Sequence, residues 1–215
     1  IRRDKVAAMF KAQKTGLWLG TRAHLVHYPI ANGQLLNIVA IVETTSAPPT
    51  GWSTPGEADK LLRCFENWSK PAYSLLQQVA EWRIWALYDR DPALAWGKGR
   101  VTLLGDAAHP MLPFLAQGGA MAIEDAWVLA VFLKENLGSP QAALRAYENI
   151  RITRTTQVVE TSRSNATMFH LSGRQRLMRN IALTASRAAP QLLLKKYDWL
   201  YGYNALDEKP GDFSD

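Results

Sequence analysis

Residues 100–137 combine an apolar run, a loop rich in glycine and proline, and a long apolar segment. The run 100–104 predicts a short buried strand, and 105–117 predicts a loop. Residues 119–137 are apolar on most faces, which predicts a deeply buried helix. In open sheets covered by helices, ligands bind where a strand ends and a loop leads into a helix. This segment therefore predicts a ligand site at its loop.

The loop supplies residue types that suit a flat, partly anionic ligand. Asp106 follows the expected strand, and a carboxylate there can accept hydrogen bonds from sugar or ribityl hydroxyls. Gly118 and Gly119 let a planar group approach the backbone closely. Free N–H groups at the helix amino terminus favour negative charge. A lone Gly-Asp pair would equally fit a turn that only shapes the chain.

An Asn-Gly pair separates two β-rich runs nearer the amino terminus. Residues 24–30 and 34–42 flank Ala31-Asn32-Gly33, which predicts an antiparallel hairpin because the central residues need positive φ. Pro29 cannot donate to a ladder of strands, so we expect the first strand to lie at an edge or to end there.

The remaining elements are expected from periodicity and turn residues. Pro71 and Pro140 each suit the first turn of a helix. We expect helices over 57–68, 71–80, 139 to about 170, and from 174 to the aromatic tail at 199–203, a strand over 83–88, and loops over 45–55 and 89–99.

Cys64 is the one cysteine, so an internal disulfide framework and a multi-cysteine metal site are excluded. It fits a reducing cytoplasm, and we expect a cytoplasmic protein without a resident metal. No apolar run reaches the roughly 18 residues that cross a bilayer. The start at Ile1 is neither an initiator methionine nor a signal peptide, so we expect a piece of a longer chain.

One stretch closely resembles the second FAD-binding motif of the class A flavoprotein monooxygenases. It consists of the run from Gly105 to Pro110, followed by Pro113 and by 117–126. Within that family it is most similar to the salicylate hydroxylase and 3-hydroxybenzoate 6-hydroxylase types. The resemblance covers most of the chain. Residues 16–20, 24–29 and 36–40 resemble the family's substrate-domain sheet, and 199–203 its tail, although Asn204 stands where an Asp is expected.

The resemblance implies an α+β or α/β fold that forms part of a class A flavoprotein hydroxylase. We expect a partial substrate-binding sheet domain over 1–96, the last strand, loop and helix of the FAD-binding domain over 97–138, and a helical carboxyl-terminal region over 139–215. The family's opening Gly-x-Gly-x-x-Gly unit and its middle Asp-Gly motif are absent. We therefore expect an amino-terminal FAD-binding half of about 170 residues on the same precursor or on a second chain. This fragment alone is expected to be inactive.

Several residue roles follow from the resemblance. Asp106 is implied to bind the ribityl chain of FAD, and Pro113 with the backbone from Gln117 to Met121 to line the isoalloxazine ring. The implied cofactor-binding set is Gly105, Asp106, Pro113, Gln117, Gly118, Gly119, Ala120 and Met121. His109 either steadies the pyrophosphate loop or is a satisfied loop histidine. Two acids, Glu124 and Asp125, are expected only to complement a helix start.

The implied reaction is FAD- and NAD(P)H-dependent hydroxylation of a phenolic aromatic acid by O₂ through a flavin C4a-hydroperoxide, which needs no metal and no protein nucleophile. Its partners are a small aromatic substrate and O₂. We expect His27, on the strand face opposite Tyr28, to handle the phenol proton, and Gln117 to bond the same substrate edge. His24 lies on the face opposite His27 and is expected to be structural.

Net charge is +6, and residues 140–196 carry ten Lys/Arg against two acids. Such a stripe can indicate nucleic acid, or it can face an acidic partner domain or steer anionic substrates and NAD(P)H. No nucleic-acid motif is present, so we favour the second interpretation, and we expect neither a nucleic-acid nor a membrane partner. Two alternatives stay open for function: a related flavoprotein monooxygenase acting on another ring system, and a non-catalytic basic interaction module. A homodimer is also open.

Overall fold

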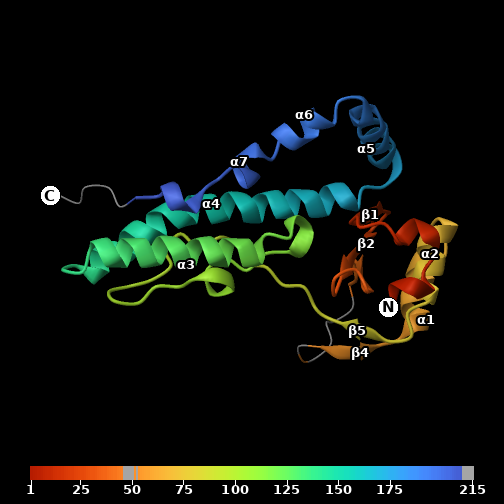
Figure 1. Ribbon diagram of the computed structural model, residues 1–215, viewed down its shortest axis with the longest axis horizontal. Coiled ribbons are helices and arrows are strands. Elements are labelled where there is room, and N and C mark those ends of the chain that lie inside the picture. The colour runs from red at the N-terminus through yellow and green to blue at the C-terminus, as the bar shows by residue number, and fades with distance from the viewer. Residues whose placement is uncertain (46–50, 52, 210–215) are drawn as a thin grey trace. The chain divides into compact units, whose positions relative to one another are not determined.

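The protein is described from a computed structural model that covers residues 1–45, 51 and 53–209. It divides into two compact units, the first made of 1–86 with 167–181 and the second of 87–166 with 182–215 (Figure 1). Neither unit is continuous in sequence. The three successive segments expected from the sequence remain a prediction for the complete protein.

A three-stranded antiparallel sheet forms the centre of the first unit. Its strands are β1 (Gly16–Leu19), β2 (Ala23–Ile30) and β3 (Leu35–Val42), in the order β1-β2-β3. The expected hairpin between β2 and β3 is confirmed, with Ile30 paired to Leu35. Ala31, Asn32 and Gly33 all have positive φ, at 50°, 52° and 78°.

Of the two expectations for Pro29, an edge strand is wrong because β2 is central, whereas the end of the strand is confirmed within one residue because β2 ends at Ile30. Strand β1 pairs only with residues 24–27 of β2, so Pro29 lies beyond its end. Pro29 is paired with Leu36 on the other side. Leu36 directs its N–H and its carbonyl at Ile1, away from β2, so this pair uses no N–H from Pro29. The missing N–H therefore interrupts no hydrogen bond between the strands, and β2 ends one residue later.

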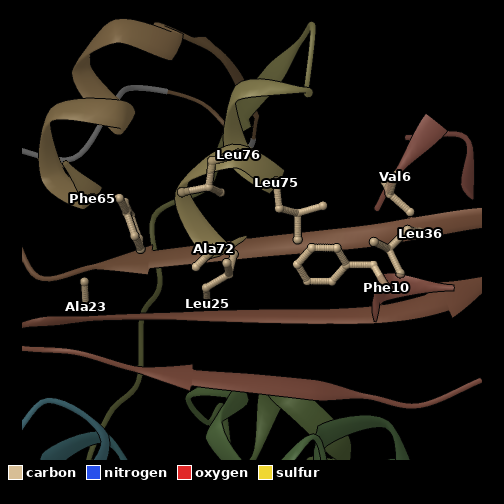
Figure 2. Packing of buried hydrophobic residues seen from close by; sticks show 9 residues of the cluster. All are labelled: Val6, Phe10, Ala23, Leu25, Leu36, Phe65, Ala72, Leu75 and Leu76. Carbon is tan, nitrogen blue, oxygen red and sulfur yellow. The ribbon is translucent and has the colours of Figure 1, made fainter. Parts of the chain in front are cut away.

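One face of this sheet is covered by two helices, α1 (Ala58–Phe65) and α2 (Lys70–Gln77). The expected helices over 57–68 and 71–80 are thus confirmed with shorter bounds. Two single turns, η1 (Arg3–Lys5) and η2 (Ala8–Phe10), complete the cover. Figure 2 shows the buried side chains between helices and sheet: Val6, Phe10, Ala23, Leu25, Leu36, Phe65, Ala72, Leu75 and Leu76.

A second, two-stranded sheet pairs β4 (Thr54–Gly56) with β5 (Trp82–Ile84). The strand expected over 83–88 is therefore only partly confirmed. The loop expected over 45–55 falls largely on residues 46–50 and 52, outside the described residues.

The second unit is built on two antiparallel helices joined by a short loop, α3 (Gly118–Glu135) and α4 (Pro140–Phe169) (Figure 1). The turns η3 (Gly105–Ala107) and η4 (Pro113–Leu115) precede them. Their shared core consists of Trp96, Ala108, Val128, Phe132, Ala143, Ala146 and Tyr147. Both helices expected from the sequence are confirmed, and α4 ends within one residue of the expected position.

The strand expected over 100–104 is wrong among the described residues. Val101 is 66% exposed, and its N–H bonds to the Lys98 carbonyl in a turn. Leu103 N–H bonds to the Trp96 carbonyl instead of to a neighbouring strand. A strand needs a partner strand to satisfy its backbone, and no described strand lies beside this run. Leu104 has an extended backbone, with a φ of −147° and a ψ of 147°.

The expectation of a deeply buried α3 is also wrong for the described residues. Its fully buried side chains form one stripe, Met121, Asp125, Val128 and Phe132. Elsewhere Ile123 is 73% exposed and Trp127 45% exposed. The helix is apolar on most faces, but the described residues cover only one of them.

The chain continues through α5 (Gly173–Ala185), η5 (Ser186–Ala188), α6 (Pro190–Lys195), α7 (Asp198–Tyr201) and η6 (Ala205–Asp207). Asn204, which stands where an Asp is expected, caps η6 by accepting the Leu206 N–H at 3.2 Å. No helix in the described part of the chain is long and apolar enough to cross a membrane.

Candidate functional site

A tight turn places Asp106 in front of the amino terminus of α3. Gly105 has a φ of +60°, and a Cβ added there would lie 3.2 Å from the Ala122 Cβ. Its N–H donates to Asp125 Oδ2 at 3.0 Å, and His109 Nε2 meets the same oxygen at 2.6 Å. Asp125 therefore holds both ends of the turn from Gly105 to His109.

Asp125 is fully buried and is itself held by Arg151, whose Nε donates to Asp125 Oδ1 at 2.6 Å. Burial raises the pKa of Asp125, but hydrogen bonds from His109, Gly105 and Arg151 outweigh burial and leave that pKa below its ordinary value. The Asp125 carboxylate is thus charged, and the bonds that it accepts from Gly105 and His109 fix the turn.

Glu124 extends this network from the adjacent position on α3. Its Oε2 lies 2.8 Å from Arg151 Nη1, and both of its oxygens accept bonds from Arg154 at 2.8 Å. The expectation that Glu124 and Asp125 complement a helix start is wrong, because no acid lies in the first turn of α3. These acids act deeper in the helix, as partners of buried arginines.

The amino terminus of α3 is open to a ligand. No side chain caps it at Gln117, and a Cβ added at Gly119 would meet nothing within 4 Å. A Cβ on Gly118 would lie 3.8 Å from Asp106 Oδ1, so the carboxylate lies close to the first helical turn. Ala116 has a φ of 53°, a left-handed conformation that turns the chain into the helix.

The predicted cofactor residues come together here, all within the second unit. Asp106, Pro113, Gly119 and Ala120 are exposed, Gln117 and Gly118 are half-buried, and Gly105 and Met121 are buried beneath them.

Sequence reasoning missed the side chains that hold this loop from outside. Arg90 Nη2 donates to the carbonyls of Ala107 and Ala108, at 2.6 and 2.8 Å. From α4, Ser162 Oγ donates to the Leu112 carbonyl at 2.6 Å and Asn165 Nδ2 to the Phe114 carbonyl at 3.3 Å. Nothing in the local sequence pattern marks these distant residues as loop supports.

The two β2 histidines lie in the first unit, on opposite faces of the sheet. His27 shares the helix-covered face with Leu25 and is itself buried. Its ring packs edge-on against Phe10 at 5.0 Å, and a Cβ on Gly16 would lie 2.1 Å from its Nε2. Burial lowers the pKa of His27. His27 Nδ1 has no hydrogen-bond partner among the described residues.

His24, expected to be only structural, belongs to a buried chain of hydrogen bonds. Its Nδ1 lies 2.7 Å from His170 Nε2, and His170 Nδ1 lies 2.6 Å from Glu43 Oε1. Burial and the neighbouring His170 lower the pKa of His24 to about 4. The ring is therefore neutral near pH 7.

The open face of the sheet carries His24 and a row of apolar side chains. Leu17 is 45% exposed, Ile30 39%, and Tyr28 and Leu35 each 36%. In the first unit, α1 and α2 occupy the other face. A ligand of this sheet would therefore contact the face that carries His24 and Tyr28.

The profile of the FAD binding domain family matches residues 7–162, so the chain belongs to this family. The 3-amino-4-hydroxybenzoate 2-monooxygenase of Streptomyces platensis is 39% identical over 204 residues, which are 94% of this chain and 50% of that protein. The 3-hydroxybenzoate 6-hydroxylase of Polaromonas naphthalenivorans is 38% identical over 189 residues, 87% of this chain and 46% of that protein.

A solved structure of a salicylate hydroxylase substrate complex matches with a TM-score of 0.78 at 28% identity, over 93% of this chain and 50% of that one. This match confirms the expected class A flavoprotein hydroxylase fold. The chain spans about half the length of these relatives.

Proposed function

We propose that this chain is the carboxyl-terminal half of an FAD- and NAD(P)H-dependent hydroxylase of phenolic aromatic acids. The observation that carries the proposal is the Gly105–His109 turn, which buried Asp125 fixes beside the uncapped amino terminus of α3. An amino-terminal half would supply the rest of the nucleotide site. The single cysteine, Cys64, supports a cytoplasmic location.

The residues present fit a flavin. The exposed Asp106 carboxylate can accept hydrogen bonds from ribityl hydroxyls, and Gly119 leaves room for a flat ring against the backbone. The free N–H groups of the first turn of α3 favour the anionic edge of a reduced ring by about 0.3–1 kcal/mol. Pro113 in η4 and Gln117 just before α3 are proposed to line the ring. When bound, FAD supplies the redox chemistry that activates O₂ for transfer to the substrate ring.

The sheet of the first unit is proposed to hold the aromatic substrate. Its open face offers apolar contact through Leu17 and Ile30 and a polar group through Tyr28, and His24 is buried on the same face. Removing the phenol proton makes the ring electron-rich at the moment of oxygen transfer, which is the task of a positioned base. Gln117 is proposed to bond the same substrate edge.

We propose His24 for the role that the sequence assigned to His27. Helices α1 and α2 cover the face of His27, and its ring is packed among Phe10 and Trp18. His24 lies on the opposite face of the sheet. It is 1% exposed against 7% for His27, but it is linked to a second histidine and a carboxylate, whereas the Nδ1 of His27 has no hydrogen-bond partner among the described residues.

The proposal is tested on the complete protein. Purified protein should be yellow and should oxidise NAD(P)H faster when 3-hydroxybenzoate, salicylate or 3-amino-4-hydroxybenzoate is added, with one oxygen atom appearing in the product. Uric acid, the ligand of a related solved structure at 26% identity, tests another ring system. A colourless protein would point to a non-catalytic module, and a response to uric acid alone would overturn the substrate class.

A further inference from the structure

The chain Glu43–His170–His24 joins a buried histidine to the protein surface. His24 is 1% and His170 8% exposed, whereas the Glu43 side chain is 48% exposed. Both hydrogen bonds of the chain are short, at 2.7 and 2.6 Å. These three groups come from β2, from the residue after α4, and from the residue after β3, so tertiary folding alone assembles them.

The hydrogen-bond roles follow from the carboxylate at one end. A carboxylate only accepts, so His170 Nδ1 donates to Glu43. When His170 is neutral, its Nε2 carries the lone pair and accepts from His24 Nδ1. This order leaves the lone pair of His24 on its Nε2, which makes that atom the basic end of the chain.

The surrounding backbone fixes His170 in place. Arg22, with a φ of 57°, donates its N–H to the His170 carbonyl at 3.3 Å and accepts the Glu43 N–H at 2.9 Å. Arg179 Nη1 donates to the carbonyls of Met168 and Phe169 at 3.0 and 2.8 Å. A group held from both sides in this way keeps the geometry that proton transfer requires.

We propose that Glu43 and His170 form a proton relay that carries a proton from His24 to solvent, a role that rests on the proposed function of His24. When His24 Nε2 takes the phenol proton, its Nδ1 proton passes to His170 Nε2. The Nδ1 proton of His170 passes to Glu43, which releases it to water. One proton enters and one leaves, and the reverse sequence restores the original tautomers.

The electrostatics of the site agree with a relay. A ring whose pKa is lowered to about 4 holds a captured proton only briefly, so the proton must be passed on. Among the described residues, the charged groups around the chain are Glu43, Arg22, whose Nε lies 3.5 Å from Glu43 Oε2, and Arg179 of α5, which donates to the Phe169 carbonyl. Strands β1 and β3 place only Leu19 and Ile41 opposite His24.

The test measures proton release from the complete FAD-loaded protein on mixing with 3-hydroxybenzoate, using a pH-indicator dye and phenolate absorbance in stopped flow. Glu43→Gln should slow proton release at least about 100-fold, the lower end for a displaced general base. Glu43→Asp should recover most of the rate. Glu57→Gln is the matched control, since Glu57 is an exposed acid paired with Lys60 in the same unit. Flavin content should be equal in all four proteins.

Release at the wild-type rate in Glu43→Gln, or equal slowing in Glu57→Gln, would overturn the relay. Ring ¹⁵N NMR of the same proteins gives a readout without turnover. His24 should carry its proton on Nδ1 in the wild type, and its pKa should fall further in Glu43→Gln because a stabilising negative charge is lost. If the wild type forms no phenolate, the proposed function fails, and the relay is then judged by the NMR alone. An unchanged His24 titration in Glu43→Gln would contradict it.

Discussion

At the scale of single residues, Asp106 of the loop and Asp125 of α3 have different roles. Asp106 is exposed and close to the start of α3, whereas Asp125 is buried and holds the turn from behind. A substitution of Asp106 should therefore change ligand binding, and a substitution of Asp125 should change the free energy of unfolding.

Asp106→Ala in the complete protein should weaken FAD retention without unfolding it, because the side chain is exposed and offers its oxygens to a ligand. Loss of one charge-assisted hydrogen bond costs roughly 1.5–3 kcal/mol, about a 10- to 100-fold weaker Kd. Flavin fluorescence after dialysis measures the change. Asp207→Ala, at another exposed acid of the second unit, is the control. Equal flavin content in both variants would remove Asp106 from the cofactor site.

Asp125→Asn should lower the free energy of unfolding by about 3 kcal/mol at pH 7, because it leaves the buried guanidinium of Arg151 poorly compensated. The folded-state pKa of Asp125 lies below its unfolded value near 3.9, so its contribution is complete above about pH 4. That contribution is lost as the pH falls through the lowered folded pKa. Urea unfolding of both proteins between pH 3 and 7 measures it. A difference that grows on acidification would contradict the assignment.

His24→Ala should slow oxygen transfer by about 10²–10⁴-fold while flavin reduction without substrate stays near the wild-type rate. A base acts on the ring only when oxygen is transferred, so peroxide release should rise. His27→Asn is the comparison, and it should change mainly stability because that ring is packed in the core. Stopped-flow absorbance times the two steps separately. Should only His27→Asn slow oxygen transfer, the base is His27, as the sequence suggested.

At the scale of elements, backbone conformation decides how the loop meets α3. Gly105 and Ala116 bracket the loop, and both have left-handed φ values, of 60° and 53°. Glycine adopts this conformation freely, whereas a Cβ costs about 1–2 kcal/mol there. The two positions therefore predict opposite effects of exchanging Gly and Ala.

Gly105→Ala should lower the free energy of unfolding by about 1–2 kcal/mol, since the new Cβ is strained and would lie 3.2 Å from the Ala122 Cβ. Ala116→Gly should leave stability equal or raise it by up to about 1 kcal/mol. Chemical denaturation of the two variants checks the pair. Stabilisation by Gly105→Ala would show that the turn relaxes to another conformation.

At the scale of the whole molecule, the chain spans about half the length of its relatives, and apolar side chains of the second unit are exposed. Ile123 and Trp127 lie uncovered on α3, and among the described residues Val101 is paired only with Lys98, in an isolated bridge. We propose that the amino-terminal half covers α3 and pairs with the run 100–104.

The 215-residue chain alone should bind FAD weakly or not at all, because the contacts proposed for it are those to the ring and the ribityl chain and its sequence has no Gly-x-Gly-x-x-Gly unit for the ADP part. The complete protein should bind FAD tightly. Hydrogen exchange should show residues 101–104 protected in the complete protein and open in the fragment. Stoichiometric tight binding by the fragment would disprove the division of the site.

The sequence by itself determined the local and short-range features of this protein. Local backbone preferences that act within a few residues explain the Asn-Gly hairpin, the Gly-Asp turn, and the first turns of α2 and α4, which contain Pro71 and Pro140. The motif at 105–126 also indicated the family to which the chain belongs. Such signals are readable because their energetics do not depend on distant partners.

Tertiary structure alone decided which faces are covered and which distant groups meet. Pro29 lies in a central strand because β1 is short, and 100–104 is no strand because nothing described pairs with it. Asp125 meets Arg151, and His24 meets His170 across 146 residues of sequence. Burial and pairing depend on partners far along the chain, which no local pattern encodes.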